Sequence, residues 1–137
     1  MRYAVISDLH ANLQGLHAVL ADMDRRSFDT VVCLGDVVGY GPQPAETLQL
    51  CQQRCHNFIL GNHDAVAAGL LDLEMFNEDA QRSSRWTLTK LGEGAREFFK
   101  RVPLTLEGDD VFMSHATVSN PAGFGYLDDS ESAAPEF

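Results

Sequence analysis

Apolar residues along the chain occur either in short β-branched runs or in longer stretches with helical spacing. Three short runs, at residues 3–6, 30–34 and 58–60, predict strands covered on both faces. Each run is followed by a segment in which apolar residues recur every three or four positions; these segments span residues 12–24, 44–55 and 65–71. The repeated order of strand and helix predicts an α/β fold with an open, largely parallel sheet.

The second half of the chain continues with helices and ends in a polar segment. Residues 78–90 and 93–101 have helical spacing, and two glycines separate the helices that they predict. From Asp128 onward the residues are small and polar. We therefore expect one domain at residues 1–127 and a disordered tail at residues 128–137.

Side chains that can bind metal follow the predicted strands. A hairpin is predicted where residues 104–106 and 111–113 flank a polar turn. The candidates are Asp8 and His10 after the first strand, Asp36 after the second, Asn62 and His63 after the third, and His115 after the hairpin. In open α/β sheets, ligands bind beyond the carboxyl ends of the strands. The sequence therefore predicts that these side chains converge on one edge.

The polar residues after the third predicted strand also have a purely structural interpretation. Gly61 permits a tight turn after an apolar run, and Asn62 could cap the helix that follows. That interpretation explains one strand end and leaves the other three unexplained. Polar ligands at four equivalent positions favour a functional site.

The types of ligand narrow the chemistry. Carboxylate, imidazole and amide donors together suit manganese, iron, zinc, nickel or cobalt, whereas a magnesium site would contain fewer histidines. Asp36 could bridge two cations with its two oxygens. Two neighbouring cations would clamp a phosphoryl group and activate water. His63 then remains to protonate a leaving oxygen, and Asp64 could orient its ring.

Charge and cysteine content limit the remaining classes. A net charge of −10 argues against nonspecific binding to nucleic acid and against binding to anionic membranes. The first apolar run, residues 3–6, is too short for a signal peptide or a membrane span. Three cysteines form an odd set, so we expect a reducing, cytoplasmic location.

Three motifs carry a resemblance to a known family. They are Asp8-x-His10, Gly35-Asp36-x-x-x-x-Gly41 and Gly61-Asn62-His63-Asp64, in this order and at these spacings. Together they resemble the calcineurin-like metallophosphoesterases, and the residues around them look like the small bacterial phosphodiesterase branch. The resemblance implies an α/β/β/α sandwich that hydrolyses phosphomonoesters or phosphodiesters, so the expected partner is a phosphate-ester substrate.

The resemblance also implies roles for individual residues. Asp8, His10 and Asp36 would hold one divalent metal ion, and Asp36, Asn62 and His115 would hold a second. Manganese is the first expectation for both. His63 would donate a proton beside the phosphate, supported by Asp64.

This chain departs from the family pattern in three places. Ala11 and Ala116 stand where the family has glycine, and no histidine follows His115, although the family has a later Gly-His-x-His motif. We expect a truncated chain in which each metal keeps three ligands and the second sheet is incomplete. Apolar surface left on the sheet would favour association of two copies. The alternative is a non-catalytic interaction module that binds one metal or none.

Overall fold

A three-stranded parallel sheet lies at the centre of the structure, a computed structural model that describes residues 1–108 and 110–136. Its strands are β1 (Tyr3–Ile6), β2 (Thr30–Cys33) and β3 (Asn57–Phe58), and β2 lies between the other two. The β1 residues pair with β2 in parallel register. The predicted parallel sheet is therefore present. The turn residue 109 of the predicted hairpin and tail residue 137 lie outside the described part.

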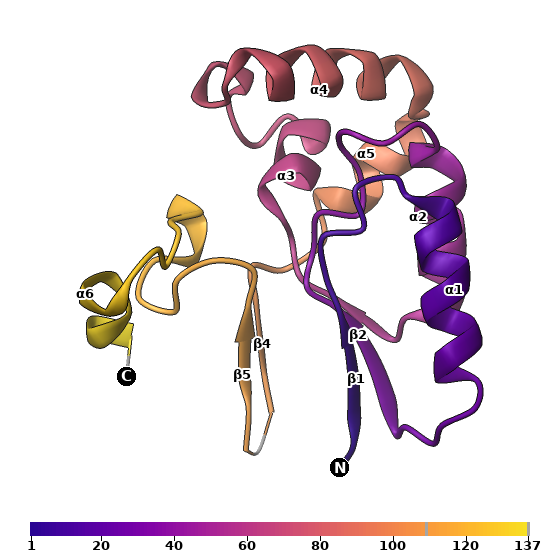
Figure 1. The fold of residues 1–137 in the computed structure, drawn as a ribbon. Coiled ribbons are helices and arrows are strands. Elements are labelled where there is room, and N and C mark those ends of the chain that lie inside the picture. Colours follow the sequence, from indigo (N-terminus) through magenta and orange to yellow (C-terminus); the bar gives the residue numbers. More distant parts are fainter. Residues whose placement is uncertain (109, 137) are drawn as a thin grey trace.

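Helices cover one face of this sheet. α1 (Leu13–Met23) and α2 (Pro44–Arg54) lie on the side opposite the hairpin in Figure 1. The Asn12 side chain caps α1 by accepting from the Gly15 amide at 2.8 Å. Pro44 opens α2, where its missing N–H costs no helical hydrogen bond. Their apolar faces and the strands form the main core.

Three further helices lie at the carboxyl end of the strands. They are α3 (Asn62–Ala68), α4 (Glu78–Lys90) and α5 (Glu93–Phe99), and the 3₁₀ turn η1 (Leu73–Met75) connects α3 to α4. α3 packs against both α4 and α5. Figure 1 shows this group above the strands.

A small second sheet completes the fold. β4 (Thr105–Glu107) and β5 (Phe112–Ser114) pair antiparallel, and η2 (Pro121–Gly123) follows them. The predicted fold class, an α/β structure with a small second sheet, is confirmed. Val5 of β1 and Phe112 of β5 are 47% and 46% exposed. The association of two copies through this surface stays a prediction.

The third strand is shorter than predicted. Its pairing with β2 ends at Phe58, although the apolar run continues through Leu60. The Ile59 amide still donates to Cys33 O, but the Leu60 amide donates to Pro103 O, 2.8 Å away. The backbone therefore leaves β2 to bond a segment that lies far along the chain, which local sequence does not reveal.

The helix after the third strand begins three residues earlier than predicted. Its N-cap is Gly61, and Asn62 is the first helical residue, so the interpretation of Asn62 as the cap is wrong. The Asp36 carboxylate accepts a hydrogen bond of 2.9 Å from the His63 amide. This amide lies in the first turn of the helix, where N–H groups have no partner within the helix. Gly69 ends the helix in the left-handed region, at a φ of 74°.

Short helical elements lie in the segment that we expect to be a disordered tail, and that expectation stays a prediction. The segment contains α6 (Ser130–Ala133) and the 3₁₀ turn η3 (Ala134–Glu136). Asp129 caps α6 by accepting from the amides of Glu131 and Ser132, a local signal that composition alone does not show. The domain boundary at residue 127 stays a prediction. Among the described residues, no helix has the length and apolar character that crossing a membrane requires.

Candidate metal centre

The predicted ligands converge at the carboxyl edge of the first sheet, around Asp36. His10 Nε2 lies 3.8 Å from Asp36 Oδ2, and His115 Nε2 lies 3.6 Å from the same oxygen. His10 Nε2 is also 3.7 Å from Asp8 Oδ1. Residues from two other strand ends thus lie around the Asp36 carboxylate.

Two groups of three ligand atoms share this carboxylate. His10, Asp36 and His63 form one group, and Asp8, Asp36 and His115 form the other; within each, the atoms lie within 4.8 Å of one another. Asn62 joins the second group, because its Oδ1 lies 3.1 Å from His115 Nε2. Every residue that the sequence indicated as a ligand therefore lies in this cluster.

The backbone around the cluster is strained. Asp8, His10 and Asp36 have φ values of 54°, 46° and 52°, in the left-handed region that side-chain-bearing residues rarely adopt. Cross-links between the two loops hold this conformation: Asp8 N donates to Gly35 O at 3.0 Å, and His10 N donates to Asp36 O at 2.9 Å. Such strain is concentrated at functional sites, where the surrounding structure maintains it.

Two of the three departures from the family pattern can be located in the structure. Ala11 has a φ of 55° and no exposed surface, so it occupies a left-handed position that glycine would fill without strain. Ala116 is not among the residues with positive φ, so alanine in place of glycine causes no backbone strain in the loop that carries His115.

The orientation of the two imidazoles fits metal binding. His10 Nδ1 lies 3.2 Å from Val38 O, and His115 Nδ1 lies 2.7 Å from Leu34 O. Because a carbonyl only accepts, each Nδ1 carries the proton and each Nε2 presents a lone pair toward Asp36. His115 Nε2 and Asn62 Oδ1 then face each other as two acceptors, and a cation bound by both relieves their repulsion. The donor set therefore fits a divalent metal.

The electrostatics of Asp36 lead to the same conclusion. Its side chain is 4% exposed, and burial, with the added effect of the Asp8 charge, raises the pKa of Asp36 to about 7. Within the described residues, the ring nitrogens that lie within 4 Å of its carboxylate belong to His10 and His115, whose Nε2 atoms carry no proton in this arrangement. A buried carboxylate without a permanent cation is costly, and a bound metal removes that cost.

His63 lies at the inner side of the cluster in an aromatic environment. Its ring is 4.7 Å from Tyr40 and 4.6 Å from Phe76, measured between ring centroids. Burial, reinforced by His10 and His115, lowers the pKa of His63 to about 4. Its Nδ1 has no hydrogen-bond partner in the described part of the chain.

Asp64 has a different contact from the one that the sequence suggested. Its carboxylate accepts from the Val37 amide at 3.3 Å and from the Val38 amide at 3.2 Å. It does not hydrogen-bond to the His63 ring, so the idea that Asp64 orients His63 directly is not supported by these contacts. Instead Asp64 holds the loop that follows Asp36. Burial raises the pKa of Asp64 to about 8.

Asp64→Asn should destabilise the protein by about 1–2 kcal/mol, because one buried amide loses its acceptor. Urea unfolding of the metal-free protein measures this change. Asp22→Asn is the control, since Asp22 is exposed and pairs with Arg25 and Arg26 on the surface; it should change stability by less than about 1 kcal/mol. Equal effects of the two variants would show that the Asp64 contacts do not stabilise the loop.

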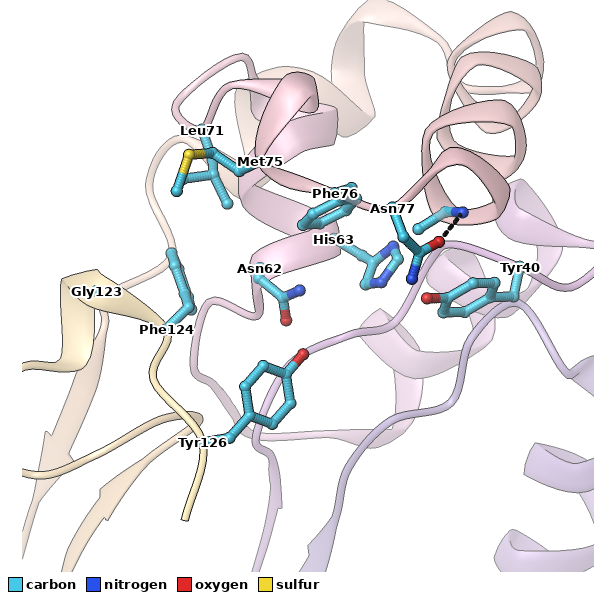
Figure 2. Close-up of a pocket in the computed structure, with 11 residues that line it drawn as sticks. Tyr40, Asn62, His63, Leu71, Met75, Phe76, Asn77, Gly123, Phe124 and Tyr126 are labelled. Atoms are coloured by element: carbon cyan, nitrogen blue, oxygen red, sulfur yellow. Dashed lines mark hydrogen bonds between the residues drawn. The ribbon is translucent and has the colours of Figure 1, made fainter. Parts of the chain in front are cut away.

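A pocket beside the metal centre contains residues that the sequence did not single out. Figure 2 shows the rings of Tyr40, Phe76, Phe124 and Tyr126 around Asn62 and His63. These aromatic residues come from three distant loops, so their convergence had no local signal. The one feature of the sequence that could have indicated this pocket is the pair of aromatic residues Phe124 and Tyr126, which follow the last ligand, His115.

Comparison with known proteins identifies the family. A sequence model described as calcineurin-like phosphoesterase matches residues 1–134. The chain belongs to the calcineurin-like phosphoesterase family. It is 37% identical over 128 residues to an uncharacterized protein of Methanocaldococcus jannaschii, an alignment that covers 90% of this chain and 53% of the relative. The chain thus spans about half the length of the curated relative that it matches.

Solved structures agree with this assignment. A metallophosphoesterase from Sphaerobacter thermophilus superposes with a TM-score of 0.82 at 35% identity, covering 100% of this chain and 56% of that one. A hypothetical protein from Pyrococcus horikoshii has the same TM-score of 0.82 at 20% identity, covering 97% of this chain and 62% of its own. The second likeness shows the fold alone. This calcineurin-like phosphoesterase spans 56% and 62% of the lengths of these two solved chains.

Proposed function

We propose that this protein is a metal-dependent phosphoesterase with a two-metal site. The observation that carries the proposal is the position of Asp36, which belongs to both groups of ligand atoms. A carboxylate shared by two groups is the arrangement that a bridged pair of cations requires. The substrate class is phosphodiesters or phosphomonoesters.

The family resemblance divides the ligands between two cations, whereas distance alone groups Asp8 with His115 and His63 with His10 around Asp36. Asp8, His10 and Asp36 would hold one, and Asp36, Asn62 and His115 would hold the other. Imidazole, carboxylate and amide donors suit manganese best among the candidates, with iron, zinc, nickel or cobalt as alternatives. Bound divalent cations supply charge stabilisation at the phosphoryl oxygens and activate water at neutral pH.

The protein's own side chains provide the remaining chemistry. His63 faces the cluster from the first turn of α3 and is placed to give a proton to the leaving oxygen. In the metal-free protein its low pKa keeps the ring neutral. The negative charge of a bound phosphate ester acts in the opposite direction to burial and favours the protonated form of His63.

His63→Gln should retain bound metal and reduce hydrolysis of an aryl phosphodiester about a hundredfold, as loss of a general acid predicts. Turnover and metal content are measured on the same preparation. His17→Gln is the matched control, because His17 is exposed on α1; it should leave both quantities unchanged. Loss of metal in the His63 variant would make His63 a ligand and contradict the division of roles.

The alternative is a member of the family that binds metal without turnover. In the proposed division, this chain gives three protein ligands to each cation. Water can complete an open catalytic site. Retained metal with no hydrolysis of either phosphate ester class would favour the alternative.

We also infer a reducing compartment. Cys33, Cys51 and Cys55 are all free and buried, and the Cys51 and Cys55 sulfurs lie 3.5 Å apart without a disulfide. Neighbouring free thiols persist where the environment keeps them reduced. A cytoplasmic location is consistent with this state, and localisation of a tagged chain tests it.

A further inference from the structure

We propose that the pocket beside the metal centre binds an uncharged planar aromatic group, of about nucleobase size, on the phosphate ester. Because this inference names the organic part of the substrate, it rests on the phosphoesterase function proposed above. The pocket has a volume of about 300 Å³. That volume lies at the lower end of the range for small-molecule sites and exceeds what a methyl or ethyl ester would fill.

The pocket and the metal centre share a wall. Asn62 and His63 line the pocket and also belong to the ligand cluster. A phosphate held at the cluster would therefore place its ester oxygen next to this wall. Figure 2 shows the rings of Tyr40, Phe124 and Tyr126 around these two side chains, and we place the organic group of the ester among these rings.

The walls of the pocket are suited to a flat ring. His63 already packs against Tyr40 and Phe76 at centroid distances of 4.7 and 4.6 Å. Phe124 holds a left-handed backbone with a φ of 48°, and its ring lies 6.3 Å from that of His115. Aromatic faces gain most from another planar group at such distances. An aliphatic chain would lack this favourable interaction with the aromatic rings.

The polar groups of the pocket limit the ligand further. Asn77 Oδ1 accepts from the Ala80 amide at 3.0 Å and caps α4, which leaves the Asn77 amide hydrogens as donors at the pocket. A ring nitrogen or carbonyl oxygen can accept from them. Among the described lining residues, none is Asp, Glu, Lys or Arg. The pocket therefore disfavours a charged group.

The test compares two inert anions on the full chain loaded with manganese. Phenylphosphonate and methylphosphonate share the phosphonate group, and neither has an ester bond to hydrolyse. Calorimetric titration should show phenylphosphonate binding about tenfold more tightly. Equal affinities would overturn the inference and leave the metal centre unaffected.

Two aromatic variants make the comparison specific. Tyr126 is 76% exposed, so Tyr126→Ala should leave the fold intact and reduce the preference for phenylphosphonate to about threefold or less. Trp86→Ala removes an exposed aromatic residue of α4 that does not line the pocket, and it should keep the full preference. A preference unchanged in the Tyr126 variant would contradict the assignment to this pocket.

A second probe separates failure of the inference from failure of the proposed function. Adenosine has a planar base and no phosphate, so its binding needs no metal. In NMR spectra of the metal-free protein, adenosine should shift the ring signals of Phe76 and Tyr126 and leave those of Trp86 unchanged. If neither phosphonate binds, the phosphoesterase proposal fails, and these shifts alone still support the pocket. Absence of the shifts overturns the inference whatever the phosphonates do.

Discussion

Asp36→Asn should abolish metal binding and lower hydrolysis of phosphate esters by at least about a thousandfold. Asp36 is the one residue common to both groups of ligand atoms, and the amide removes its charge and one of its two ligating oxygens. The fold should survive, because the amide oxygen can still accept from the His63 amide. The metal-free variant should be as stable as the native protein or slightly more stable, since a buried carboxylate is replaced by a neutral group.

The increase in the free energy of unfolding on adding manganese measures metal binding by Asp36→Asn and by the native protein. Manganese at about one hundred times its dissociation constant should stabilise the native protein by about 2.7 kcal/mol for each bound ion and should not stabilise the variant. Asp24→Asn is the control, because Asp24 lies on the surface and pairs with Arg54; it should keep the full metal-dependent stabilisation. An Asp36 variant that still gains stability from manganese would remove Asp36 from the centre of the site.

Gly61→Ala should destabilise the protein by about 3 kcal/mol and weaken metal binding. The backbone of Gly61, with φ −87° and ψ 166°, is one that alanine adopts easily. The obstacle is space: a Cβ at Gly61 would overlap Asp36 Oδ1 and the Asp36 backbone nitrogen. Backbone cannot move aside as a flexible side chain does, so the loop carrying Asp36 would have to shift. Urea unfolding and manganese titration measure the two effects.

Gly92→Ala is a closely matched control. Gly92 is also the N-cap of a seven-residue helix, with φ −82° and ψ 169°, and a Cβ there would meet nothing within 4 Å. Both variants share the small cost of alanine at an N-cap, so their difference isolates the contact with Asp36. The Gly92 variant should change stability by less than about 1 kcal/mol and leave metal affinity unchanged. Equal destabilisation of the two variants would show that the contact with Asp36 is not the cause.

Much of the fold follows from local patterns. The bounds of β1 and α4 agree with those that the apolar residues predict. The prediction that the first strand is covered on both faces is wrong for the described residues, because Val5 is 47% exposed. The ligand cluster was also predictable: parallel strands end at the same edge, so Asp8 and Asp36 meet there without any further information.

Other features depend on contacts between distant segments, which sequence patterns do not contain. The hydrogen bond from Leu60 to Pro103 shortens β3, and the amides of Val37 and Val38 determine where Asp64 binds. Asp64 stands next to His63 in the sequence, yet consecutive residues of a helix point in different directions. Proximity along the chain therefore suggested a contact that the helix geometry does not make.

Metal content per chain, measured by elemental analysis after equilibration with manganese, tests the central claim most directly. The cluster around Asp36 predicts about two ions per chain, together with turnover of an aryl phosphodiester by the same preparation. Absence of retained metal would contradict the account, because the converging side chains of Asp8, Asp36 and His115 would then have no cation to explain them.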